Sequence, residues 1–259
     1  MNFPNFPGKT DCQAVLTAQD IVDYRRRTGR LARVPQLDGV LLCLERGLPR
    51  RLRWKIPIEE IAKLNGNLYG VRKTRNKVAV IANFGAGSPM VVSLAEEFIA
   101  MGAKRLILVT GGGALQPELS AGDIVVCSQA LRDEGASYHY LPPARYVPSD
   151  GQLADRLMVA IQARGKPCTR GATWTTDAGF RETVEEVQQY QSEGVKTVEM
   201  ESAGLFAVCQ ARGVAAVSAI VVMDSLAQMR WQPPEKVDTI QRSLETVYTA
   251  AIDVLAAGT

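Results

Sequence analysis

The amino-acid sequence predicts a single α/β domain, and three observations support this fold class. First, 259 residues with 46% hydrophobic and 22% charged side chains are enough to build one large core. Second, several short runs are continuously apolar, as expected of strands that are buried on both faces of a sheet. Third, segments with apolar residues at helical spacing follow these runs, and glycine-rich turns join the two. This pattern is typical of a sheet flanked by helices.

The position of each element follows from its own pattern. Continuous apolar runs predict strands at residues 39–44, 68–72, 77–83, 105–110, 122–127, 171–176 and 214–222. Helical spacing predicts helices at residues 18–30, 90–101, 150–164, 177–190 and 236–255, and another that carries Ala203 to Cys209 and ends at Gly213. Glycine favours the end of a helix, so Gly29, Gly102 and Gly213 are expected to end three of these helices.

The charge distribution separates an N-terminal arm from the rest of the chain. Residues 1–38 are expected to form a basic helical arm, and residues 39–259 the α/β domain. Arginines gather at positions 25, 26, 27, 30 and 33, and a second basic group lies at 46–55. These groups form either a solvated face or an anion site. The formal net charge of +3 gives no reason to expect a nucleic acid partner.

Cysteine usage and the N-terminal residues point to a cytoplasmic protein. The five cysteines have no CxxC spacing, so neither a disulfide framework nor a metal site is expected, and no cofactor is implied. The first residues have no basic segment followed by an apolar one, and no apolar run approaches the length of a membrane span. We therefore expect a cytoplasmic location and no membrane partner.

The segment 197–206 is the strongest candidate for a binding site. Glu199 and Glu201 are two residues apart, so in an extended backbone both carboxylates point the same way. Two fixed acceptors suit neighbouring hydroxyls of a sugar, and Met200 between them offers an apolar wall. The alternative is that both glutamates are a solvated strand end and helix start, where acidic residues are common.

Two glycine turns and one aspartate are expected at the same edge of the sheet. Residues 84–89 (FGAGSP) and 111–117 (GGGALQP) each follow a predicted strand, where open parallel sheets bind ligands. The turn at 84–89 is not a dinucleotide fingerprint, and no P-loop lysine follows it. Asp224 ends the last predicted strand and is either a site residue or an ordinary turn residue. The single histidine, His139, is either structural or catalytic, and no nucleophile motif accompanies it.

Taken together in this order, four motifs between Gly39 and Leu226 resemble those of the nucleoside phosphorylase superfamily. They are the turn at 84–89, the segment 111–126, the DEGAS core of 132–139, and VEMES at 198–202. The superfamily contains uridine phosphorylase, hexameric purine nucleoside phosphorylase and the methylthioadenosine/adenosylhomocysteine nucleosidases. The resemblance implies a single domain whose mixed sheet curls into a barrel-like core, a homo-oligomer of two to six subunits, and a pentosyltransferase acting on a nucleoside.

The resemblance also implies roles for particular residues. Met200 and Glu201 would bind the ribose, with Glu199 near the same sugar. Asp224 would be the acid that protonates the leaving base, as in the purine and nucleosidase branches. Uridine phosphorylases bind uracil through a glutamine and an arginine, of which this chain offers only Arg181. The residues expected to border the base are Thr175, Thr176, Phe180 and Arg181.

The phosphate site departs from the superfamily pattern. The positions of the usual phosphate-binding arginine and hydroxyl residue are Leu108 and Gly111 here, and the N-terminal histidine that reaches a neighbouring subunit is absent. A dianion needs charge-assisted donors, which Arg46, Arg72 or a partner subunit's arginine would have to supply. The residues expected around a phosphate are Gly85, Arg46, Gly111 and Gly112.

Three functions therefore compete at the level of the sequence. The first is a nucleoside phosphorylase, with inorganic phosphate as co-substrate, that cleaves a purine or pyrimidine nucleoside; Asp224 favours purine. The second is a nucleosidase that uses water, with Glu45 as a candidate base. The third is a protein that binds nucleosides without cleaving them.

Overall fold

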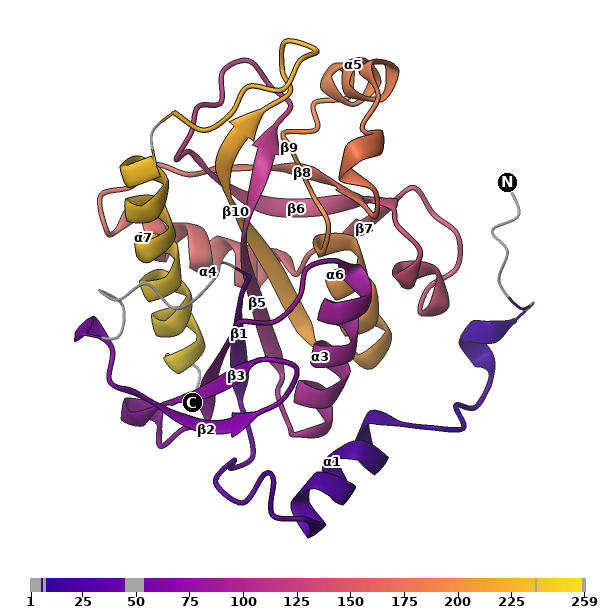
Figure 1. The fold of residues 1–259 in the computed structure, drawn as a ribbon, viewed down its shortest axis with the longest axis vertical. Helices are drawn as coiled ribbons and strands as arrows, with labels where there is room; N and C mark the ends of the chain where they lie inside the picture. Colours follow the sequence, from indigo (N-terminus) through magenta and orange to yellow (C-terminus); the bar gives the residue numbers. More distant parts are fainter. Residues whose placement is uncertain (1–5, 7, 45–53, 236, 258–259) are drawn as a thin grey trace.

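The computed structural model describes residues 6, 8–44, 54–235 and 237–257, and its centre is one ten-stranded sheet. The strand order is β10-β6-β8-β9-β5-β1-β4-β3-β2, β10 also pairs with β5, and the tenth strand, β7, pairs with β6. Five strands therefore close into a ring, from which β1, β4, β3 and β2 extend as an open sheet (Figure 1). The strands are β1 (Gly39–Cys43), β2 (Ile58–Lys63), β3 (Asn67–Val71), β4 (Val78–Ala82), β5 (Arg105–Ala114), β6 (Ile124–Asp133), β7 (Tyr146–Pro148), β8 (Thr169–Thr176), β9 (Thr197–Glu199) and β10 (Ala215–Ser225). The predicted mixed, curled sheet is confirmed.

Strand β5 is the branch point of this sheet. It pairs in parallel with β1 and with β10, and Arg105 lies opposite Gly39 on one side and Ala215 on the other. Beyond the end of β1, it also pairs antiparallel with β9, where Gly113 lies opposite Val198. Because β1, β4, β5 and β10 are parallel, their carboxyl ends meet at one edge, where α/β folds commonly bind ligands.

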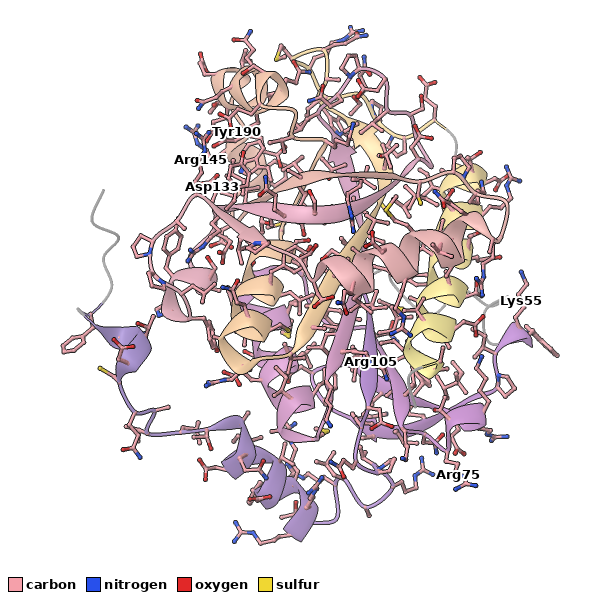
Figure 2. All side chains as sticks on the ribbon, turned by 180° about the vertical axis from the view of Figure 1, so that it is seen from behind. Lys55, Arg75, Arg105, Asp133, Arg145 and Tyr190 are labelled. Carbon is pink, nitrogen blue, oxygen red and sulfur yellow. The ribbon has the colours of Figure 1, made fainter. Side chains whose placement is uncertain are left out.

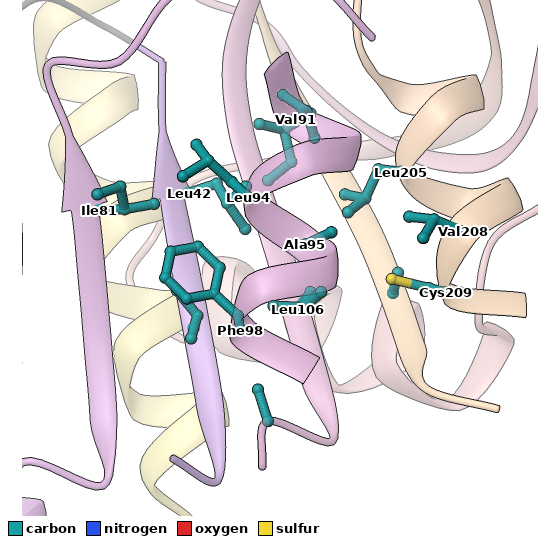
Figure 3. Close-up of a cluster of buried hydrophobic side chains, with 14 of the residues drawn as sticks. Leu42, Ile81, Val91, Leu94, Ala95, Phe98, Leu106, Leu205, Val208 and Cys209 are labelled. Carbon is teal, nitrogen blue, oxygen red and sulfur yellow. The ribbon is translucent and has the colours of Figure 1, made fainter. Parts of the chain in front are cut away.

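Helices cover both faces of the sheet. Helices α3 and α6 pack together on one side, and α4 and α7 pack together on the other (Figure 1). Figure 3 shows the hydrophobic core on the α3 and α6 side of the sheet, in which Phe98 and Leu94 of α3 lie against Leu42 of β1. The helices are α1 (Ala18–Arg27), α3 (Ser88–Ala100), α4 (Gly151–Gln162), α5 (Val184–Ser192), α6 (Ser202–Arg212) and α7 (Val237–Ala256). No helix of the described residues is long and apolar enough to cross a bilayer.

Three local predictions were wrong. The glycines predicted as a turn at 111–117 lie within β5, which continues to Ala114. The helix predicted at 177–190 begins only at Val184, because Thr183 and Glu186 form a capping box there. The strand predicted at 122–127 runs on to Asp133. Strands β2 and β7 were not predicted at all.

The N-terminal residues lie along one side of the body. Thr17 and Asp20 form a capping box that starts α1, and Arg25 forms an ion pair with Glu97 of α3. The chain before α1 extends away from the sheet, with Leu16 exposed (Figure 1). Most of the second basic group, including Arg46, lies outside the described residues.

Candidate active site

The candidate ribose site is built where β9 passes into α6. Strand β9 has only three residues, but it is fixed on both sides by β8 and β5. Glu201 is the N-cap residue of α6, with φ −128° and ψ −36°. The backbone therefore turns into the helix at this residue, and that Glu199 and Glu201 point the same way stays a prediction. Both are nevertheless buried, which rules out the alternative of a solvated acidic face.

Glu199 is fully engaged by the protein itself. Its Oε1 accepts a hydrogen bond from the Thr175 hydroxyl at 2.6 Å. Its Oε2 accepts from the backbone N–H groups of Glu201 (2.9 Å) and Ser202 (2.8 Å) and from the Ser202 hydroxyl (2.9 Å). The side chain is 5% exposed, and burial raises its pKa against the opposing effect of these bonds. This geometry makes Glu199 the residue that holds the Glu201 turn in place.

Glu201 connects this turn to the glycine turn at 84–89. Its Oε1 accepts from the Gly87 N–H at 2.6 Å, and its Oε2 accepts from the Met200 N–H at 3.3 Å. Gly87 has φ +95°, which side chains rarely adopt, so glycine is required there. The side chain of Glu201 is 1% exposed, and burial together with the negative charge of Glu199 raises its pKa. A hydrogen bond therefore joins the two segments that were predicted separately from the sequence, although neither segment lines the cavities of about 560 Å³ and 410 Å³ described below.

Asp224 lines a second part of the same sheet edge. It follows a bulge in β10, and its Oδ2 accepts a hydrogen bond from the indole N–H of Trp231 at 2.7 Å. Asp224 is one of the residues that line a cavity of about 560 Å³. The lining residues include Leu119, Met223, Asp224, Arg230, Trp231 and Gln232.

The glycines of β5 pair with the end of β10, so that Gly113 lies opposite Asp224. A Cβ atom at Gly111 would lie 2.3 Å from Sδ of Met223, and one at Gly113 would lie 3.0 Å from Oδ1 of Asp224. Leu108 is fully buried in the core under α3. The two positions where phosphorylases carry an arginine and a hydroxyl residue are thus a core leucine and a glycine covered by a methionine.

The four residues expected to border the base do not share a cavity with Asp224. The Thr175 hydroxyl is used by Glu199, and the Phe180 side chain is fully exposed. Thr176 and Arg181 line a different cavity, of about 410 Å³. This cavity also includes Asp133, which Figure 2 shows at the same end of the molecule as Arg145 and Tyr190.

Sequence reasoning missed two residues near Asp224. Burial and the negative charges of Asp224 and Glu186 raise the pKa of Glu182 to about 7. Trp231 lies seven positions after Asp224, and no motif marks it. An acidic residue and a tryptophan in two irregular connections carry no periodic signal, so only their position in space identifies them.

The remaining candidates lie away from this edge or outside the described residues. Arg72 follows β3 at the amino end of β4, because Gly70 pairs with Ala79 near the start of that strand. His139 lines neither the 560 Å³ cavity nor the 410 Å³ cavity, and burial and the charge of Lys9 lower its pKa. Gly85 is exposed in its turn. Glu45 and Arg46 are outside the described residues, which contain no cluster of His, Cys, Asp and Glu that could hold a metal ion.

Comparison with known proteins places these motifs in a family. The sequence is 26% identical over 247 residues to a uridine phosphorylase of Haemophilus influenzae, covering 85% of this chain and 95% of that protein. It is also 26% identical to a DeoD-type purine nucleoside phosphorylase of Bacillus cereus, covering 69% of this chain and 77% of that protein.

A solved structure has the same fold. The uridine phosphorylase of Vibrio fischeri superposes with a TM-score of 0.72 at 22% identity, covering 86% of this chain and 96% of that one. The family pattern of the phosphorylase superfamily matches residues 53–257. This match includes the glycine turn before α3, the Glu201 turn and the end of β10, and the chain belongs to the phosphorylase superfamily.

Proposed function

We propose that this protein is a nucleoside phosphorylase, a pentosyltransferase that cleaves the N-glycosidic bond of a nucleoside with inorganic phosphate as acceptor. The observation that carries the proposal is the buried Glu201 carboxylate between the glycine turn and α6. The names of the relatives, which include uridine and purine nucleoside phosphorylases, support the same class of reaction.

In this proposal the ribose binds against the turn at 199–201. Glu201 accepts hydrogen bonds from the ribose hydroxyls, Met200 forms the apolar wall, and Glu199 keeps the turn in place. Cleavage builds positive charge on the ribosyl group, and a fixed carboxylate in a dry site stabilises that charge. Asp224 gives a proton to the base as it leaves, so that the base departs without a negative charge.

The base that fits best is a purine. Asp224 shares its cavity with Met223 and Trp231. Asp224 offers an acid to a flat bicyclic ring, and the other two residues offer apolar surface. Arg181, the residue that uracil recognition would need, lines the other cavity. Thr176 and Phe180 would then border the base only after a rearrangement of the segment 176–182, and Thr175 would act through Glu199, to which its hydroxyl donates.

Hydrolysis by water is the second candidate, and one observation favours it. Leu108 is buried in the core and Met223 covers Gly111, so neither position offers a donor to a phosphate dianion. A phosphorylase would bind phosphate through the backbone around Gly85 and Gly112 and through Arg46 or a partner subunit's arginine. A nucleosidase needs none of these donors, and Glu45 would serve as its base.

The cellular setting is part of the same proposal. The protein would act in the cytoplasm as a homo-oligomer of two to six subunits, with no cofactor. Residues 39–259 would form the catalytic domain, and residues 1–38 a basic arm beside it.

Release of free base from a panel of purine and pyrimidine nucleosides, measured by chromatography with and without phosphate, tests the proposal. Release only with phosphate, together with ribose 1-phosphate, is the expected result. Equal release without phosphate would replace the phosphorylase with a nucleosidase. No release under either condition would contradict both and favour a nucleoside-binding protein without turnover.

A further inference from the structure

The segment after β10 folds back and brings Trp231 onto Asp224. Ser225 and Gln232 exchange backbone hydrogen bonds, from the Ser225 N–H at 3.1 Å and from the Gln232 N–H at 2.8 Å. Met229 takes φ +57° inside this loop, and the Ser225 hydroxyl accepts from the Ala227 N–H at 3.2 Å. The loop is therefore a closed hairpin, and the position of Trp231 is fixed by its backbone.

The hydrogen bond from Trp231 determines which oxygen of Asp224 can carry a proton. An indole N–H can only donate, so Oδ2 must offer it a lone pair. A proton on Asp224 therefore lies on Oδ1, the oxygen next to Gly113. Among the described residues Trp231 is the hydrogen-bond donor to this carboxylate, so it also fixes the side-chain rotamer.

The ring of Trp231 is placed for a second contact. Its side chain is 63% exposed although its N–H is bonded, and it lines the same cavity as Asp224. An exposed indole beside a carboxyl group offers a flat apolar face next to a proton donor. A purine can stack on such a face while a ring nitrogen accepts the proton.

We propose that Trp231 is a positioning residue for Asp224, holding Oδ2 so that Oδ1 is the oxygen that carries the proton, and that its ring forms one wall of the base pocket. This inference rests on the proposed function, because it assigns Asp224 as the acid. It also specifies the substrate as a nucleoside whose base is a bicyclic aromatic ring with an acceptor nitrogen, that is, a purine nucleoside.

Two substitutions separate the hydrogen bond from the ring. Trp231→Phe removes the N–H and keeps an aromatic face, whereas Trp231→Ala removes both. Trp54→Phe is the matched control, since Trp54 is also exposed and does not line the cavity that contains Asp224. Thermal unfolding of each variant checks that the fold is intact.

The kinetic test uses release of base from inosine, guanosine and adenosine. In Trp231→Phe we expect kcat to fall by about 10- to 100-fold with KM within about twofold, as loss of a hydrogen bond to a charged group predicts. The pH profile of kcat should shift as well, because the bond acts on one ionisation state of Asp224. In Trp231→Ala, KM should rise in addition. Unchanged kcat and pH profile in Trp231→Phe would overturn the positioning role.

A double variant tests whether Trp231 acts through Asp224. In an Asp224→Asn background, Trp231→Phe should change kcat by less than about twofold, because residues that act as one unit are not additive. Full additivity of the two effects would overturn the proposal.

A direct binding experiment separates this inference from the proposed function. Should the wild-type protein release no base from any nucleoside, the proposed function fails, and calorimetric titration with adenine and hypoxanthine tests the pocket wall. Weaker binding in Trp231→Ala with unchanged binding in Trp54→Phe supports it. Equal binding in all three proteins, or no binding to the wild type, overturns it.

Discussion

Oε1 of Glu201 accepts a hydrogen bond from the backbone N–H of Gly87 over 2.6 Å, across 114 positions of sequence. The bond fastens the turn before α3 to the start of α6, and the Ser88 hydroxyl strengthens the connection by donating to the Met200 carbonyl at 3.0 Å. These bonds hold the glycine turn and Glu201 together. A substitution in either should therefore affect ligand binding through the other.

Glu201→Ala should abolish ribose recognition. The variant loses a buried acceptor for ribose hydroxyls and leaves the Gly87 N–H without its partner, so nucleoside affinity should fall by about 10- to 100-fold or more. Calorimetric titration with a nucleoside measures the effect, and Glu185→Ala, on an exposed helix surface, is the control. Unchanged affinity in Glu201→Ala would remove this residue from the site.

Asp224→Asn should slow base release without weakening nucleoside binding. The amide keeps the shape of the carboxyl group but cannot give up a proton, and loss of a general acid costs about 10²- to 10⁴-fold in kcat. Steady-state kinetics with purine nucleosides measure the change, with the nucleoside affinity determined separately. Cleavage at the wild-type rate would exclude the acid role.

Glu182 should make stability depend on pH between about 4.5 and 7. Its pKa is raised from 4.5 to about 7 in the folded protein, so in this window the unfolded chain has lost the proton that the folded state keeps. The free energy of unfolding therefore falls as pH rises through the window and loses nothing further above it.

Glu182→Gln removes this dependence. Its melting temperature should equal that of the wild type near pH 4 and exceed it at pH 8, while the exposed neighbour variant Glu185→Gln should show no such trend. Parallel melting curves of Glu182→Gln and wild type across the whole range would contradict the shift.

Gly112→Ala should destabilise the fold. An added Cβ would lie 2.6 Å from the carbonyl oxygen of Val198 and 2.8 Å from Cγ2 of Ile220, and the backbone of β9 has little room to move. We expect a loss of about 1–3 kcal/mol in urea unfolding, as is usual for overpacking. Gly151→Ala, at the start of α4 with no atom near the new methyl group, is the control. Equal stability of the two variants would contradict the close packing.

The strands buried on both faces could be predicted from the sequence, because their signal lies within a few consecutive residues. In β1 and β4 every residue is buried, so the apolar run and the strand coincide. The continuation of β5 through Gly111–Gly113 could not be predicted, because glycine alone favours a turn. What keeps these glycines in a strand is their pairing with β10 and β9, which are distant in sequence. The close approach of Met223, Val198 and Asp224 leaves little room for a Cβ atom there.

The candidate site was predictable in its parts but not in its assembly. Glu201 and the turn at 84–89 each carry a recognisable pattern, whereas the hydrogen bond between them depends on the packing of α3 against α6. The pairing of Glu199 with Thr175 and Ser202 also depends on tertiary structure, and it turns an expected sugar ligand into a support for the turn. Trp231 and Glu182 belong to no pattern, so their place beside Asp224 required the structure.

The ring of β5, β10, β6, β8 and β9 also bears on how the protein emerges from the ribosome. Strand β10 is the last of the five to be synthesised, and until it arrives β5 and β6 each lack the neighbour that it provides. A nascent chain that ends before residue 215 exposes these unpaired strand edges and is prone to aggregate. Strand β10 also carries Asp224. Its synthesis therefore covers the unpaired edges of β5 and β6 and at the same time adds the proposed catalytic acid.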